Sequence, residues 1–239
     1  QNIYAGLSKV SYAWNHLDAA AQYANQCIQL CQQWGDSVPQ ATGYVMSAWL
    51  EHAQGNPEKA QGTMRVVEQL ASQYSLPPRL SIWVQSSLAR LWLAQGDLGR
   101  ASYFVQQSGI SIDDDISYLR EPAYLVLLRV LLAQGNHEAA LALSARLLKL
   151  AEATNRLGKV IEILILQALA LHAQKDITQA LPLLERAVLL AQPEGYVRVF
   201  LDEGEPMAKL LYQAKAHRIG SGYVAELLSA TGKAVNIVQ

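Results

Sequence analysis

The sequence predicts an all-α fold, an α-solenoid of about five antiparallel helix pairs followed by a C-terminal helical cap. One short stretch, Ala133–Ala140, recurs along the 239-residue chain at a nearly constant spacing. A fixed period of this size is typical of stacked supersecondary units, each of which contacts only its neighbours. Every copy also places a helix-ending signal directly before a helix-starting one. Hydrophobic residues make up 51% of the chain, which is enough to form a core between such helices.

The repeated stretch reads AQGNHEAA at Ala133–Ala140 and has four relatives in the chain. They are Ala53–Ala60, Ala94–Ala101, Ala173–Ala180 and a more divergent first copy, Ala13–Ala20. The leading alanines are therefore 40, 41, 39 and 40 residues apart. This regularity predicts repeats of about forty residues.

The residues of each copy explain why one helix ends there and another begins. A glycine or asparagine at the turn tolerates the left-handed backbone that closes a helix. The next polar residue is expected to cap the following helix through its free N–H groups, at Asn56, Asp97, Asn136 and Asp176. A small alanine five residues after the turn allows two helices to approach closely. This combination resembles the turn of tetratricopeptide (TPR) repeats, whose period is about 34 residues, so forty residues imply longer helices.

The predicted helix pairs follow these copies in order. The first pair covers residues 1–33, and its second helix carries apolar residues at helical spacing from Leu17 to Cys31. Pro39 and Pro78 open the second and third units, since proline favours the first turn of a helix. The later pairs are predicted at 39–54 with 57–74, 79–95 with 97–107, 119–134 with 136–153, and 156–174 with 176–191. The corresponding repeats span 1–38, 39–76, 77–118, 119–155 and 156–192.

Two features interrupt the regular pattern. Pro182 stands inside the last of these helices, where it either kinks the helix or delays its start. After Pro193 the repeat stops, and residues 193–239 are expected to form a capping and linking segment. Helices are predicted there from Pro206 to about Lys215 and from Tyr223 to Ser229. Such a segment would cover the apolar face that the final repeat otherwise exposes.

Composition excludes several classes of partner. The net charge is −1 and 16% of residues are charged, so no overall field attracts the chain to nucleic acid or acidic lipid. No apolar run is long enough to cross a membrane, and the N-terminus lacks the pattern of a signal peptide. Cys27 and Cys31 form at most half of a zinc site, and we interpret them as core residues in a reducing compartment. We therefore expect a cytoplasmic location, no metal and no membrane partner.

The tail of the chain resembles a known family. Gly195–Gly204, Pro206-Met207, Leu210-Leu211 and Gly222–Leu228 are similar to the end of the sensor region in MalT-like proteins, the large ATP-dependent transcription activators of the LuxR type. In that family an N-terminal ATPase module of the STAND class precedes a superhelical, TPR-like sensor domain of roughly forty-residue helix pairs. A helix-turn-helix domain that binds DNA follows. The resemblance implies that this chain is the sensor domain.

The two neighbouring domains of that family have no counterpart in this sequence. The chain contains no G-x-x-x-x-G-K-[ST] phosphate loop, and Lys233–Gln239 after Gly232 are too few for a helix-turn-helix. The resemblance therefore implies that ATP binds only in a missing N-terminal domain and DNA only through a missing C-terminal one. No cofactor is expected in the segment itself.

By analogy with TPR geometry, the first helix of each pair lines the concave face, and two positions in it point inward. The position six before the turn holds Lys9, Trp49, Arg90, Arg129 and Leu169, and the position three before it holds Tyr12, His52, Leu93, Leu132 and His172. Stacked cations and an aromatic ring can bind a carboxylate, a peptide or a sugar. The candidate ligand-binding residues are therefore Lys9, Tyr12, Trp49, His52, Arg90, Arg129 and His172. The alternative is that Trp49 and Leu132 only pack between repeats and the cations are solvated.

Three charged residues in the family-like tail form a second candidate group, Arg198, Asp202 and Glu203. One hypothesis is that they relay a signal to the DNA-binding domain. The other is that they form a local salt bridge that fixes the cap, since such pairs are common and individually weak.

The pattern favours recognition over catalysis. No nucleophile is paired with a base, and no metal-binding motif is present, so an enzyme is not expected. We expect a regulatory, signal-sensing domain of a bacterial LuxR-type activator that binds a small-molecule inducer or a protein or peptide partner. The alternative is a generic TPR-like scaffold that binds a peptide or helix in its concave groove. Open-ended solenoids often pair through their terminal faces, so self-association is a further option, and the sequence does not fix the oligomeric state.

Overall fold

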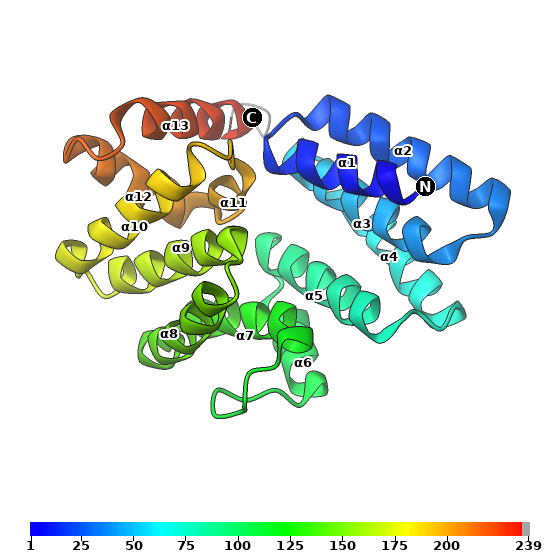
Figure 1. Cartoon of the computed structure of the whole chain (residues 1–239), viewed down its shortest axis with the longest axis horizontal. Helices are drawn as coiled ribbons and strands as arrows, with labels where there is room; N and C mark the ends of the chain where they lie inside the picture. Colours follow the sequence, from blue (N-terminus) through cyan, green and yellow to red (C-terminus); the bar gives the residue numbers. More distant parts are fainter. Residues whose placement is uncertain (236–239) are drawn as a thin grey trace.

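The structure, a computed structural model, describes residues 1–235 and consists of packed helices (Figure 1). Within those residues it contains thirteen α-helices, one short 3-10 helix and no strand, so the predicted all-α solenoid is confirmed. The five helix pairs of the repeats are α1 (Asn2–Ala13) with α2 (Leu17–Trp34), α3 (Ser37–Ala53) with α4 (Pro57–Gln73), α5 (Pro78–Ala94) with α6 (Leu98–Ser108), α7 (Glu121–Ala133) with α8 (His137–Ala153), and α9 (Leu157–Ala173) with α10 (Ile177–Ala191). None of the helices in this described part has the length and apolar character needed to cross a membrane.

The turns between paired helices have the predicted left-handed backbone. The turn residue has φ between +60° and +82° in all five copies, at Asn15, Gly55, Gly96, Gly135 and Lys175. Glycine adopts this conformation without steric cost and asparagine tolerates it, whereas Lys175 adopts it against the usual preference of residues with a Cβ atom. The repeat geometry therefore dictates the backbone even where the sequence has lost its glycine.

Three of the four predicted caps are present. Asp97, Asn136 and Asp176 each accept a hydrogen bond from a backbone N–H two or three positions into the next helix. The prediction is wrong for Asn56, whose side chain makes no capping bond. Pro57 follows it directly, and φ at Asn56 is −111° instead of the −84° to −88° of the other three. The shift has the direction that proline imposes on the residue before it.

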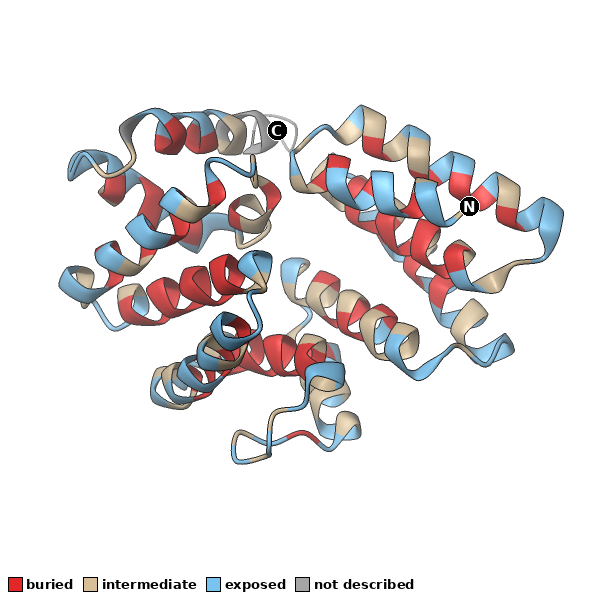
Figure 2. Ribbon diagram, in the orientation of Figure 1, coloured by how far each residue is buried: buried red, intermediate tan, exposed pale blue. Residues whose placement is uncertain are grey.

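The first helices of the pairs form an inner layer and the second helices an outer one (Figure 1). Helices α1, α3, α5, α7 and α9 contact one another in that order. Burial is deepest on α7 and α9 (Figure 2), and all twelve residues from Val160 to Leu171 of α9 are buried. Neighbours contact α9 on several sides, namely α7, α8, α10 and the tail helices. That coverage explains why its sequence is apolar all round.

Several helix bounds differ from the prediction. Helix α10 begins at Ile177 and continues through Pro182, so the structure excludes the delayed start, one of the two alternatives for this proline. A 3-10 helix (Tyr118–Arg120) precedes α7. In the tail, α12 (Gly204–Ala216) begins two residues early, and α13 (Ser221–Val235) is longer than the predicted short helix. The last four residues of the predicted 193–239 segment lie outside the described residues.

Both cysteines are free thiols buried beside α1, in the core position predicted for them. Burial raises the pKa of the Cys31 thiol to about 12, which keeps it protonated. Within residues 1–235, no group of three or more His, Cys, Asp or Glu side chains is placed to hold a metal ion.

The tail covers the last repeat and then reaches the first one. Helix α12 packs on α9 and α10, and the short helix α11 (Arg198–Leu201) contacts α1. The backbone N–H of Val197 donates to the carbonyl of Ala13 at 2.9 Å, and the Trp14 indole N–H donates to the carbonyl of Glu194 at 2.9 Å. We call this closed arrangement of five repeats and tail the ring. The tail therefore caps the last repeat and also covers the turn of the first repeat.

Candidate functional site

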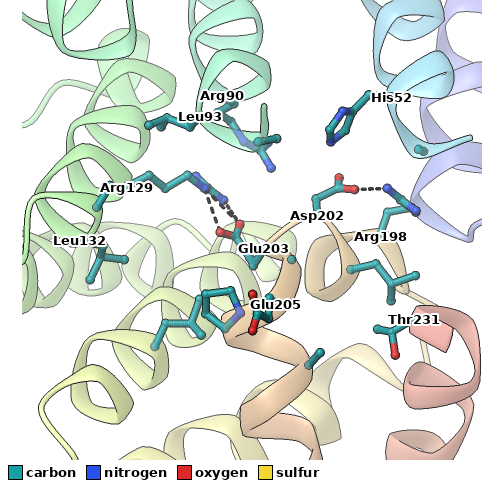
Figure 3. Close-up of a pocket in the computed structure, with 18 of the residues that line it drawn as sticks. His52, Arg90, Leu93, Arg129, Leu132, Arg198, Asp202, Glu203, Glu205 and Thr231 are labelled. Carbon is teal, nitrogen blue, oxygen red and sulfur yellow. Dashed lines mark hydrogen bonds and ion pairs between the residues drawn. The ribbon is translucent and has the colours of Figure 1, made fainter. Parts of the chain in front are cut away.

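A cavity of about 710 Å³ lies at the centre of the ring. Its walls come from the C-terminal ends of α3, α5, α7 and α9, and from the tail between Arg198 and Ala208 (Figure 3). The C-terminal ends of these four inner helices face this place, whereas α1 contributes no lining residue. We call this space the central cavity.

The repeat explains which side chains face the central cavity. Equivalent positions in four successive inner helices supply Trp49, Arg90, Arg129 and Leu169. The position one turn further along supplies His52, Leu93 and Leu132. Residues three apart lie on the same face of a helix, so both sets point inward together.

Three of the seven candidate ligand-binding residues lie outside the cavity lining: Lys9, Tyr12 and His172. The Lys9 ammonium lies over the ring of Trp83, 3.7 Å from its centroid. Tyr12 is covered by the tail. His172 lies near Lys209 of α12, and burial together with that positive charge lowers the pKa of its imidazole. Tyr12 in the first repeat and His172 in the last thus both face the tail, whereas Lys9 packs on the third repeat.

All three charged tail residues line the central cavity. Two of them, Arg198 and Asp202, also contact the first repeat. Arg198 and Asp202 form an ion pair one helical turn apart. The Tyr12 hydroxyl donates to Asp202 Oδ1 at 3.0 Å, and the Arg198 guanidinium lies over the Tyr12 ring at 5.1 Å. Burial, together with the charge of Asp202, raises the pKa of Tyr12 far above its ordinary value. Arg198 also donates to the side-chain oxygen of Asn15 at 3.5 Å. This cluster therefore links the tail to the first repeat.

Glu203 joins the tail to the fourth repeat. Its carboxylate accepts from Arg129 Nε at 3.1 Å and from a second guanidinium nitrogen at 2.5 Å. Arg129 also donates to Glu162 at 2.9 Å and to the carbonyl of Leu125 at 3.2 Å. Burial disfavours the charge of Arg129, but Glu203 and Glu162 outweigh it and raise its pKa above the ordinary value. Arg129 is therefore permanently charged and fully paired.

Glu162 is the acidic centre on the other side of this network. It accepts from Lys159 at 2.8 Å and from Arg129, and it lies 3.7 Å from Arg90. Burial acts to raise the pKa of Glu162, but Lys159, Arg129 and Arg90 outweigh it and hold the pKa below its ordinary value. The carboxylate is therefore ionised although its residue is only 6% exposed.

Sequence reasoning missed Glu162, which lies behind the lining and holds Arg90 and Arg129. It also missed the apolar tail residues Leu201, Pro206 and Ala208, which complete the walls. A signal for Glu162 existed. It is a single carboxylate inside the apolar run VIEILIL, and a charged residue is rarely buried unless it is paired. Nothing local marks the tail residues, because their position depends on how the ring closes.

Comparison with known proteins finds related sequences. A family model described as "MalT-like TPR region" matches residues 1–217. Two curated relatives, both called "HTH-type transcriptional regulator MalT", come from Vibrio campbellii and Vibrio parahaemolyticus. They are 22% and 23% identical to this chain over 214 residues, which is 89% of its length. The chain spans about a quarter of the length of these relatives, 24% in each case.

Proposed function

The chain belongs to the family of MalT-like TPR regions, and on this basis we propose that it is the regulatory, signal-sensing domain of a bacterial LuxR-type transcriptional activator. It binds an inducer or a partner protein. It relays that event to an ATPase domain and a DNA-binding domain that lie outside this chain. Two relatives that carry the name of HTH-type transcriptional regulators support the proposal.

One observation carries the sensing role: the central cavity is bounded by four repeats and by the tail together. A molecule bound there contacts both partners of the closure, since Arg198 and Glu203 come from the tail while Arg90 and Arg129 come from the repeats. Its binding free energy therefore acts on the ring as a whole, and it biases the ring toward the arrangement that it fits best. The tail leads toward the C-terminal end, where the DNA-binding domain is proposed to follow.

The size of the central cavity favours a small molecule over a helix as the occupant. A volume of about 710 Å³ falls within the range of roughly 300 to 1,000 Å³ that ligand pockets occupy. A bound α-helix is about 10 Å across with its side chains, and the tail already fills the inner side of the ring with α11 and α12. The alternative of a generic scaffold that binds a peptide or helix in an open groove therefore has less support.

Isothermal titration of the chain against a library of sugars, organic acids and short peptides tests the proposal. We expect at least one member to bind with a saturable heat and to change the emission of Trp49, which lines the cavity. Leu132→Trp, which narrows the cavity, should weaken that binding. Leu189→Trp on the exposed face of α10 is the matched control and should leave it unchanged. If no library member binds, and the chain also fails to bind the ATPase domain of its own parent protein, the sensing role is wrong.

A further inference from the structure

The central cavity does not offer an aromatic face for a sugar. Trp49 is only 7% exposed, and three side chains surround its ring. The Arg90 guanidinium lies over it at 5.2 Å, and Tyr12 and His52 meet it edge-on at 6.3 Å and 6.2 Å. Stacking of a sugar ring on this indole would require these neighbours to move. Of the three ligand chemistries that the groove pattern allows, the sugar is therefore the least compatible with the structure.

The charged network that reaches the cavity at Arg90, Arg129 and Glu203 continues behind the lining to Glu162 and Lys159, and its charges do not cancel. Three cations, Arg90, Arg129 and Lys159, surround two carboxylates, Glu162 and Glu203. Three positive charges against two negative ones leave one positive charge in excess. The other charged lining residues are each paired, Arg198 with Asp202, and Glu205 with Lys209, which lies outside the lining.

The excess charge faces the cavity at Arg90. Arg129 is held by both carboxylates, and Lys159 makes a 2.8 Å hydrogen bond to Glu162. Arg90 lies 3.7 Å from the same carboxylate, too far for a hydrogen bond, and its buried Nε has no hydrogen-bond partner within the described residues. Its side chain is 26% exposed and reaches from α5 into the space between Arg129 and His52 (Figure 3). A cation in this setting is stabilised by an anionic ligand.

The other walls set the shape and charge of that ligand. Leu93, Leu132, Leu169, Leu201 and Pro206 present apolar surface to the cavity. His52 is kept neutral, because burial and the charge of Arg198 lower its pKa more than Asp202 raises it. Arg90 is thus the cation on the described walls that is held least tightly, by one long ion pair to Glu162 and no hydrogen bond at Nε. The site accordingly matches one negative charge attached to an apolar body.

We propose that the central cavity binds a small monocarboxylate with an apolar body, its carboxylate on the Arg90 guanidinium and its body among Leu93, Leu132 and Leu169. This proposal rests on the sensing role given above and names the chemical class of the inducer. The two parallel N–H groups of a guanidinium match a carboxylate in geometry. Two sources can supply this chemistry, a free organic acid and the C-terminal carboxylate of a short apolar peptide.

Titration calorimetry with matched probes tests the proposal. The probes are octanoate and 3-phenylpropionate, their neutral amides, and an apolar tripeptide with a free or an amidated C-terminus. We expect the carboxylates to bind at least roughly tenfold more tightly than the amides, because hydrogen bonds to a charged group are the stronger ones. Binding of both organic acids identifies a free acid as the ligand class. Binding of the tripeptide with a free C-terminus alone identifies a peptide end.

Arg90→Met separates the role of the charge from that of the walls. It leaves Glu162 and Glu203 balanced by Arg129 and Lys159, so the variant should fold, which circular dichroism checks. We expect it to weaken binding of the carboxylates roughly ten- to hundredfold and to leave binding of the amides unchanged. Arg90→Lys should weaken binding of the carboxylates by a smaller factor. Arg100→Met on α6, where the side chain is 63% exposed, is the control and should change neither class.

Each other outcome overturns the proposal in a distinguishable way. The monocarboxylate proposal is wrong if neutral sugars or the amides bind as tightly as the carboxylates. It is also wrong if Arg90→Met weakens binding of the carboxylates and of the amides equally. In both cases the sensing role stands. If no probe and no member of the broader library binds the folded chain, the monocarboxylate proposal and the small-molecule part of the proposed function both fail.

Discussion

Glu162 shows how one residue can determine the charge state of the central cavity. Its carboxylate is surrounded by Arg90, Arg129 and Lys159, and the residue is nearly inaccessible to water. Removing one partner of a buried ion pair is costly because the other charges lose their compensation without regaining water. The contribution of Glu162 therefore belongs to this network and not to a single pair.

We expect Glu162→Gln to lower the free energy of unfolding by about 3 kcal/mol, since it leaves buried cations under-compensated. Urea denaturation followed by circular dichroism measures the change. Glu152→Gln is the control. Glu152 pairs with Arg186 on the surface, where the side chains are 41% and 49% exposed, and the expected loss is below about 1 kcal/mol. Equal losses in the two variants would contradict the assigned role.

The same residue predicts a pH dependence. The pKa of Glu162 is lower in the folded chain than in the unfolded one, where it is about 4.3. The unfolded chain therefore takes up the proton first as the pH falls. The stabilisation is complete above about pH 4.3 and is lost as the pH drops toward the folded value. Wild type should lose stability more steeply than Glu162→Gln between pH 5 and pH 3, roughly the range below the unfolded pKa. Parallel profiles from urea denaturation across this range would contradict the prediction.

At the scale of the elements, the approach of α2 and α3 depends on a residue without a side chain. A methyl group at Gly43 would lie 2.8 Å from Ile28 Cγ1 and 3.4 Å from the carbonyl oxygen of Ala24. Real side-chain carbons do not approach this closely, so the two helices would have to separate. Gly62 of α4 is different, because a methyl group there meets no atom within 4 Å in the described structure.

Gly43→Ala and Gly62→Ala should therefore change stability in opposite directions. We expect Gly43→Ala to lower the free energy of unfolding by about 1 to 3 kcal/mol through overpacking. Gly62→Ala should raise it by about 0.5 to 1 kcal/mol, because alanine favours an exposed helix over glycine. Thermal denaturation of both variants and of wild type measures these changes. A stabilised Gly43→Ala would show that α2 and α3 are not in close contact.

The contact of the tail with α1 depends on Trp14. Its indole N–H donates to Glu194, and its ring lies against Gly195, where an added methyl group would be 3.4 Å away. We expect Trp14→Ala to lower the free energy of unfolding by about 2 kcal/mol and to speed hydrogen exchange at the Val197 amide. Trp34→Ala, at a site that is 77% exposed, is the control and should change stability by less than about 0.5 kcal/mol. Unchanged exchange at Val197 in Trp14→Ala would show that the tryptophan does not hold the tail.

At the scale of the whole molecule, the closed ring should unfold as one unit. All five tryptophans lie between Trp14 and Trp92, so fluorescence reports the first half of the chain, whereas circular dichroism reports every helix. In wild type we expect both signals to have the same urea midpoint. In Trp14→Ala the two midpoints should separate, because nearest-neighbour contacts alone couple distant repeats weakly. Coincident midpoints in both proteins would show that the closure does not couple the two halves.

The sequence predicted what local signals encode and missed what depends on distant contacts. The signals for each turn and cap lie within eight consecutive residues, so most bounds of the five helix pairs were predicted to within about two residues. Arg90 and Arg129 were found because middle repeats share one geometry. Lys9 and Tyr12 occupy equivalent positions but lie outside the cavity, because Lys9 lies over Trp83 and the tail packs on Tyr12. That packing joins residues 180 or more positions apart and leaves no local pattern.

The closure between Trp14 and Glu194 also fixes an order of events during protein synthesis. A ribosome adds about 5 to 20 residues per second, so the intervening 180 residues take roughly 10 to 40 s to appear. Throughout that interval the nascent first hairpin displays Tyr12 and Trp14 with their final covering still unmade. The interval between synthesis of the first hairpin and synthesis of the tail is therefore a period in which these aromatic side chains are open to aggregation or to binding by a chaperone.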